Sequence, residues 1–86
     1  MAEFIVETYA ARADRAGVDS GAGRARAAAE ELTREGVPVS FLRTIFVPED
    51  ETCFYLFDAD SASAVAEAGA RAELEFDHVR ESLAPA

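Results

Sequence analysis

The sequence predicts an α+β domain of the ferredoxin-like type, with strands and helices in the order β-α-β-β-α-β. Short runs rich in β-branched and aromatic residues, which favour strands, are separated by alanine-rich segments with the apolar spacing of helices. The length of 86 residues fits one domain. We therefore expect a single domain over residues 1–86, with a four-stranded antiparallel sheet and two helices on one of its faces.

The elements follow from local composition. We expect strands at residues 3–9, 39–47, 52–58 and 76–83, with an acidic hairpin turn at residues 48–51. Residues 10–23 contain three glycines and are predicted to form a loop. The first helix is predicted at residues 24–35, capped by Asp19 or Ser20 and ended by Gly36. The second is predicted at residues 61–71, capped by Asp60 or Ser61.

The charge of the chain excludes several classes of partner. It has 17 acidic residues and eight arginines but no lysine, giving a formal net charge of -9. Nucleic acids and anionic membrane surfaces are therefore not expected partners, because both require clusters of basic residues. The sequence contains neither a signal-peptide pattern nor an apolar run long enough to span a membrane, and its single cysteine cannot form an internal disulfide. These observations together favour a cytoplasmic protein.

Apolar residues on both sides of the predicted sheet indicate self-association. If the strand at residues 39–47 alternates regularly, its two sides carry Phe41, Arg43 and Ile45, and Leu42, Thr44 and Phe46. The face not covered by helices would then be apolar, although a monomer should expose a polar face there. A domain of this size is also marginally stable alone. We therefore expect a homodimer that forms an α/β barrel.

Three polar residues in apolar strands are candidates for a ligand pocket between the two sheets. They are Glu7, Arg43 and Tyr55. A charged residue among apolar neighbours lies at a sheet edge or is paired in a cavity. For Glu7 and Arg43, a mutual salt bridge at the dimer interface is an equally good interpretation, since an unpaired buried charge is costly.

Several short motifs resemble those of a family of small bacterial proteins. The motifs are the strand around Ile5-Val6-Glu7, Gly36-Val37 before a strand ending at Val47, the turn Glu49-Asp50, the sequence Phe57-Asp58-Ala59, and a helix start at Ser61. This family is a domain of unknown function that includes a nickel-binding member with a ferredoxin-like fold, and the resemblance covers about two thirds of the chain. It implies that this protein binds nickel or another divalent metal ion.

The candidate metal ligands are His78, Glu7 and Cys53, because nickel and related ions favour imidazole and thiolate ligands accompanied by carboxylates. There is no CxxC, HxH or HExxH motif, so we expect His78 with carboxylates, or a site shared across a dimer axis. The alternatives are a half-exposed strand histidine at His78 and a small buried apolar residue at Cys53.

A different function is also compatible with the sequence. A cofactor-independent dimeric α/β-barrel enzyme, of the monooxygenase or isomerase type, would use Glu7 or His78 as a base and Arg43 or Tyr55 to stabilise an anion. A binding protein for a small organic molecule would use the same pocket. Catalysis would require a closed, largely apolar cavity with Glu7 and Arg43 inside it. No nucleotide cofactor is expected, because the glycines at positions 21 and 23 lack the lysine of a P-loop and the third glycine of a dinucleotide fingerprint.

Overall fold

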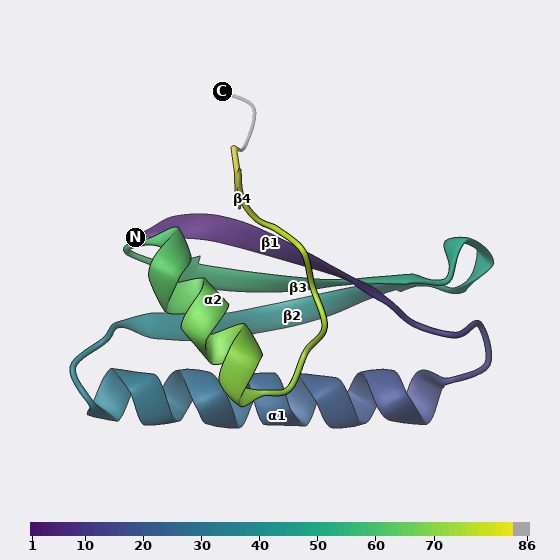
Figure 1. Ribbon diagram of the computed structural model, residues 1–86, viewed down its shortest axis with the longest axis horizontal. Helices are drawn as coiled ribbons and strands as arrows, with labels where there is room; N and C mark the ends of the chain where they lie inside the picture. Colours follow the sequence, from purple (N-terminus) through teal and green to yellow (C-terminus); the bar gives the residue numbers. More distant parts are fainter. Residues whose placement is uncertain (84–86) are drawn as a thin grey trace.

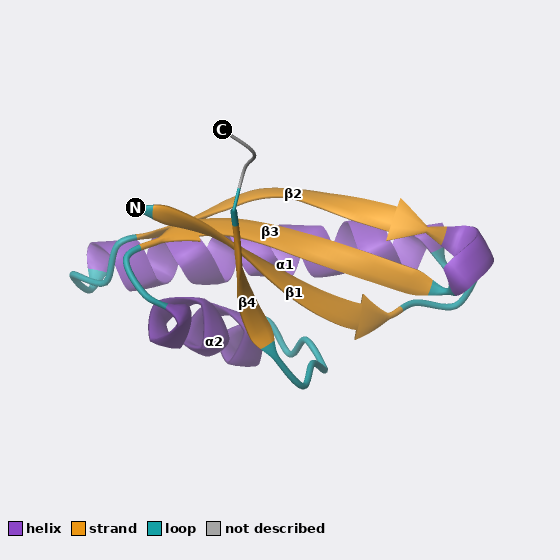
Figure 2. Ribbon diagram, turned by 90° about the horizontal axis from the view of Figure 1, so that it is seen from above, coloured by secondary structure: helices purple, strands orange, loops and turns teal. Residues whose placement is uncertain are grey.

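The computed structural model describes residues 1–83 and confirms the ferredoxin-like α+β fold. The elements are β1 (Ala2–Tyr9), α1 (Arg15–Arg34), β2 (Val39–Val47), the short 3-10 helix η1 (Pro48–Asp50), β3 (Thr52–Ala59), α2 (Ala62–Arg71) and β4 (Val79–Ser82). The four strands form one antiparallel sheet in the order β2-β3-β1-β4. Both helices lie on the same side of this sheet, and the other side is open (Figure 1, Figure 2).

Helix α1 begins much earlier than residue 24, so the prediction of a loop at residues 10–23 was wrong. Asp14 caps the helix, because its side chain accepts a hydrogen bond from the amide of Gly17 at 3.0 Å. The glycines lower helix propensity in this segment, yet Val18 and Gly21 are buried against the sheet. Tertiary packing of this face therefore overrides the local preference for a loop.

The other helix ends agree better with the sequence. Ser61 caps α2 by accepting a hydrogen bond from the amide of Ala64, as predicted. Gly36 follows α1 with a φ of 97°, and the amide of Val37 donates to the carbonyl of Leu32 at 2.9 Å. This pattern is typical of a glycine that ends a helix in the left-handed conformation.

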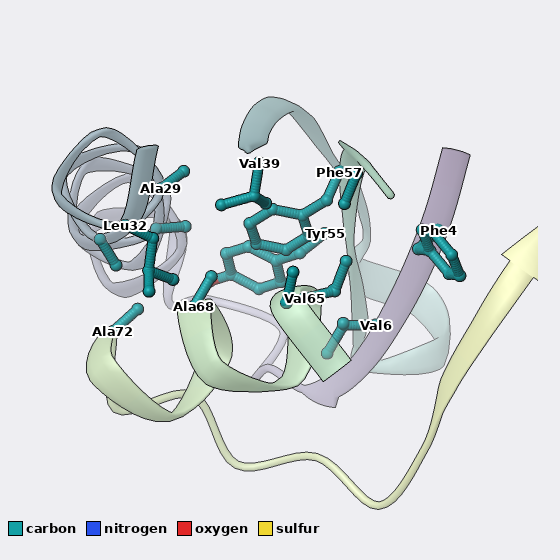
Figure 3. Close-up of a cluster of buried hydrophobic side chains, with 14 of the residues drawn as sticks. Phe4, Val6, Ala29, Leu32, Val39, Tyr55, Phe57, Val65, Ala68 and Ala72 are labelled. Carbon is teal, nitrogen blue, oxygen red and sulfur yellow. The ribbon is translucent and has the colours of Figure 1, made fainter. Parts of the chain in front are cut away.

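The core lies between the helices and the sheet. Its largest fully buried side chains are Phe57, Leu32, Val6, Val65 and Cys53. Figure 3 shows the ring of Tyr55 within the same cluster, close to Phe57. No polar or charged residue among residues 1–83 is buried. Alanines supply much of the helical contribution to this core, which lets both helices approach the sheet closely.

A bulge in β2 changes which of its side chains face the helices. Phe41 pairs with Phe57, but Arg43 pairs with Leu56, so Leu42 is an extra residue in the strand. The regular alternation predicted for β2 is therefore wrong beyond this point. Because cross-strand partners share a face, Arg43 and Ile45 lie on the open face. The prediction that aligned them with Phe41 does not hold.

The last strand is shorter than predicted. β4 spans only Val79–Ser82, whereas residues 76–78 belong to the connection from α2. It pairs with residues Glu3 to Val6 of β1, so the end of β1 beyond Val6 has no strand on that side among the described residues. Figure 2 shows β4 crossing β1 near the middle of β1. This short strand leaves room for the groove described below.

Candidate functional site

A large groove opens beside the free end of β1. Its volume is about 1460 Å³. It is lined by the end of β1, the first half of α1, the segment from η1 into β3, and the α2–β4 connection with the start of β4. The groove therefore exists because β4 stops short and because α1 begins at Arg15, ahead of its predicted start.

The lining of the groove is strongly acidic. Its carboxylates are Glu7, Asp14, Asp50, Glu51, Glu73, Glu75, Asp77 and Glu81. Against these eight, the lining has two arginines, Arg24 and Arg80, and one histidine, His78. Such a concentration of one sign of charge attracts counter-ions and repels anions. The groove is accordingly suited to cations.

Glu7 and His78 both line this groove. The β1–β4 ladder pairs Ile5 with Arg80 and Val6 with Val79. The ladder ends there, and His78 precedes the first residue of β4. The side chains of Glu7 and His78 are both exposed. A predicted carboxylate ligand and the predicted imidazole ligand therefore line one groove.

Cys53 lies elsewhere. It is fully buried on the helix side of β3, whereas Glu7 is on the open side of β1, and Cys53 does not line the groove. Burial raises the pKa of the Cys53 thiol, which opposes formation of the thiolate that metals prefer. Within residues 1–83, no group of three or more His, Cys, Asp or Glu residues is placed to hold a metal ion in one protomer.

Tyr55 also lines the groove, but from the core side. Its residue is only 4% exposed. Burial, together with the neighbouring thiol of Cys53, raises the pKa of the Tyr55 hydroxyl. The phenol is therefore neutral near physiological pH. Its hydroxyl lies against Gly21 of α1, where a side chain would overlap it.

Arg43 does not share the groove with Glu7 and Tyr55. It is exposed on the open face of β2, opposite Leu56, and is absent from the groove lining. The ion pairs in the described part of the chain all belong to Arg71, so none joins Glu7 to Arg43. Of the three predicted pocket residues, Glu7 and Arg43 therefore lie on the open face and Tyr55 on the helix side, and Arg43 alone is outside the groove lining.

Sequence reasoning missed the contribution of α1 to the groove. Arg24 donates from Nε to the carbonyl of Ala72 at 2.8 Å and from Nη1 to the hydroxyl of Ser20 at 3.0 Å. It thereby fixes the start of the α2–β4 connection to α1. The signal that could have revealed this helix is Asp14 followed three residues later by Gly17, with Val18, Ala25 and Leu32 recurring at helical spacing.

Comparison with known proteins identifies the fold and no more. No family model and no curated protein matches the sequence. The crystal structure of SCO4226 from Streptomyces coelicolor A3(2) superimposes with a TM-score of 0.73 at 24% sequence identity, covering 99% of this chain and 100% of that one. No helix in residues 1–83 is sufficiently long and apolar to cross a membrane.

Proposed function

We propose that the protein is a homodimer that binds a divalent metal ion, with nickel as the preferred example, through His78 and Glu7 in the acidic groove. The observation that carries the proposal is that these two residues both line one groove whose other lining residues are rich in carboxylates. Imidazole suits nickel, and carboxylate is a common companion ligand. The negative potential of the groove would concentrate cations there.

The homodimer is proposed for two reasons. First, a metal ion needs at least one more ligand than Glu7 and His78, and the described part of one protomer does not supply a group of three. Second, the open face carries the partly exposed apolar residues Ile5 and Phe54 and the exposed Ile45, which is 43% exposed. Packing this face against a second copy would bury apolar area and bring in ligands from the partner. Cys53 is not part of the proposed site.

The proposal predicts saturable metal binding by metal-stripped, tag-free protein. Calorimetric titration with nickel, and separately with zinc, should give a dissociation constant in the micromolar range or tighter, with the mass of the oligomer measured in the same buffer. His78→Ala removes the imidazole and should abolish binding, and Glu7→Gln should weaken it at least about tenfold. Arg34→Ala is the control, since Arg34 is exposed at the end of α1, away from both the groove and the open face, and should not alter uptake.

A contrary result is easily recognised. Weak heats that do not saturate, or equal binding by wild type and His78→Ala, would show that metal ions are attracted only to the acidic surface. Since imidazole binds metal in its neutral form, specific binding should also weaken in acid. The cofactor-independent enzyme stays a prediction: its candidate bases Glu7 and His78 line the groove together with Tyr55, one candidate anion stabiliser, whereas Arg43, the other, does not.

A further inference from the structure

We propose that the free end of β1 binds an extended basic segment of another protein, which adds to the sheet as a further strand in line with β4. In this segment, arginine or lysine alternates with apolar residues. Three features carry the proposal: unpaired backbone groups at the end of β1, the different character of the two faces of β1, and the surplus of carboxylates around it. None of them depends on a metal ion, so the proposal is independent of the function proposed above.

The end of β1 presents backbone groups to the groove. The amide of Ala10 donates to the carbonyl of Glu51 at 3.0 Å, on the side of β3. Because the N–H and C=O groups of successive residues in an antiparallel strand point alternately to its two sides, those of Tyr9 and Glu7 point to the opposite side. The β1–β4 ladder ends at Val6, and within residues 1–83 the backbone of Tyr9 makes no hydrogen bond on that side. An open edge of this kind is a template for pairing with another chain.

The α2–β4 connection is fixed to the helices, so it does not extend β4 along this edge. The amide of Leu74 donates to the carbonyl of Gly69 at 2.9 Å, and the ring of Phe76 packs so closely on Gly69 that a Cβ atom there would lie 2.6 Å from it. Arg24 of α1 donates from Nε to the carbonyl of Ala72 at 2.8 Å. The connection would have to break these contacts to pair with the end of β1, so the edge is available in the folded protein.

The groove has room for a peptide. Its volume of about 1460 Å³ exceeds the roughly 300–1,000 Å³ of a pocket for a small molecule. It also extends along the end of β1 on both faces of the sheet, since it is lined by Tyr55 on the helix side and by Phe54 on the open side. A strand placed beside β1 at the usual spacing would occupy this space.

The two faces of β1 determine which side chains the segment carries. Thr8 lies on the helix side of the sheet, whereas Glu7 and Tyr9 are exposed on the open face. Cross-strand partners share a face, so a residue added opposite Thr8 would point to the helix side. There it would meet Leu74 and Phe76, which line the groove and pack against the core. An apolar residue fits this position.

The residues on either side of it would point to the open face, among carboxylates. Opposite charges directly across two strands are stabilising, so the residue opposite Glu7 should be basic. The hydroxyl of Tyr9 contacts Oε2 of Glu51 at 3.3 Å, so a basic residue opposite Tyr9 would lie near a second carboxylate. Eight carboxylates against two arginines in the whole lining would repel an acidic segment. The expected pattern is therefore basic, apolar, basic.

The experiment is a titration of metal-stripped protein with the peptide acetyl-Arg-Val-Arg-Val-Arg-amide at physiological salt, followed by NMR. Wild type should bind the peptide saturably. The backbone amide resonance of Tyr9 should shift, and this amide should become protected from hydrogen exchange, because it acquires a hydrogen-bond acceptor. The same peptide with glutamate in place of arginine should not bind.

N-methylated peptides separate strand addition from simple attraction of charge. In the proposed pairing the arginines lie opposite Glu7 and Tyr9, so their backbone N–H groups point at β1, whereas those of the valines point away from it. Methylating the arginine backbone nitrogens should weaken binding about tenfold or more. Methylating the valine nitrogens is the matched control and should change the affinity much less, since both peptides keep the same charge.

Variants of the chain give a second test. Tyr9→Pro removes the amide donor at an edge position that tolerates proline, and it should weaken binding, whereas Tyr9→Ala keeps the donor and should bind nearly as well as wild type. His78→Ala should keep peptide binding, so this result is separable from that of the metal titration. Equal affinity for the two methylated peptides would overturn the proposal, as would a response without saturation. An unmoved Tyr9 amide at full occupancy of wild type would also overturn it, whatever the stability of the variants.

Discussion

Gly21 and Tyr55 show how one small residue sets the position of a functional group. Gly21 is buried on the sheet-facing side of α1, and the Tyr55 hydroxyl occupies the space that a side chain would fill. Helix propensity alone favours alanine over glycine at this position. The close approach of a phenol oxygen reverses that preference, because overpacking a well-filled site costs more than the gain in propensity.

We predict opposite effects of the same substitution at two neighbouring glycines. Gly21→Ala should lower the free energy of unfolding by about 1–3 kcal/mol through overlap with Tyr55. Gly23→Ala should raise it by up to about 1 kcal/mol, because a Cβ at Gly23 meets nothing within 4 Å. Urea denaturation of the two variants measures both changes.

A second substitution tests the cause of the Gly21 effect. In the double variant Gly21→Ala/Tyr55→Phe, the oxygen that clashes with the new methyl group is gone, so part of the lost stability should return. If the double variant is as destabilised as the sum of its single variants, the overlap with the hydroxyl is not the reason for the loss.

The identity of the site residues was only partly accessible from the sequence. Side chains alternate along a strand, so the sequence alone places Glu7 and Val6 on opposite faces of the sheet. A polar residue in an otherwise apolar strand can likewise be recognised from the sequence. The sequence could not predict that Tyr55 faces the core, because the face on which its side chain lies depends on how β3 pairs with β1 and β2. That Glu7 and His78 line one groove depends on how β4 and the connection before it lie against β1, which no local pattern specifies.

At the scale of elements, the two helices are joined by a single arginine. Arg71, in the last turn of α2, contacts Glu31 at 2.6 Å and Glu35 at 2.8 Å on α1, and Glu67 on its own helix at 3.2 Å. The pairing with Glu35 extends over both guanidinium ends, since Nη1 and Nη2 each donate to one of its carboxylate oxygens. Such forked contacts fix orientation better than single ion pairs do.

We predict that this cluster stabilises the fold in a pH-dependent manner. Hydrogen bonding to Arg71 lowers the pKa of Glu35 below its usual 4.5. The stability that the Arg71–Glu35 pair contributes is therefore complete above pH 4.5, the usual pKa of the carboxyl group. It is lost as the pH falls through the lowered pKa of Glu35 in the folded protein. Arg71→Met should reduce the urea midpoint at neutral pH, and its difference from wild type should shrink at about pH 3.

The control for this prediction is Arg34→Met, which removes an arginine from the end of α1. Arg34 makes no ion pair within the described residues and lowers the pKa of Glu35 only as a minor cause. Its substitution should therefore change the midpoint less than Arg71→Met does. If the urea midpoint of Arg71→Met lies below that of wild type by the same amount from neutral pH to strong acid, the electrostatic explanation is contradicted.

The elements themselves differed in how well the sequence predicted them. β3 and α2 have clear local signals, and their predicted bounds agree with the structure to within a residue. The first half of α1 was missed because its glycines lower propensity while its buried face stabilises it. The bulge at Leu42 has no signature in composition, so the faces of β2 could not be assigned beyond it.

For the whole molecule, the open face of the sheet is the feature that bears on assembly. Figure 2 looks onto this face, with both helices behind the strands. The apolar side chains on it lie on three neighbouring strands, and Leu42 adds another exposed apolar residue at the bulge. These apolar residues favour association of two copies, whereas the formal charge of -9 on each copy opposes it.

We predict that a new charge on this face prevents dimerisation. Ile45→Glu should weaken the proposed dimer about a hundredfold or more, because the carboxylate would be buried without a partner. Ala27→Glu adds the same charge to the exposed side of α1 and should leave the dimer intact. Light scattering across a dilution series measures both. Wild-type dimers should also tighten as salt screens the repulsion between copies, and a wild type that is monomeric at all concentrations would refute the model.

The strand order has a consequence for the speed of folding. β1, the first strand in the chain, lies inside the sheet, and its two neighbours are β3 and the last strand, β4. Glu3 must find Asp58 on one side and Ser82 on the other, so the central ladder closes loops that span most of the described chain. Closing such loops costs entropy before any contact is gained. We therefore expect this small domain to fold slowly for its length, with the groove beside β1 among the last parts to form.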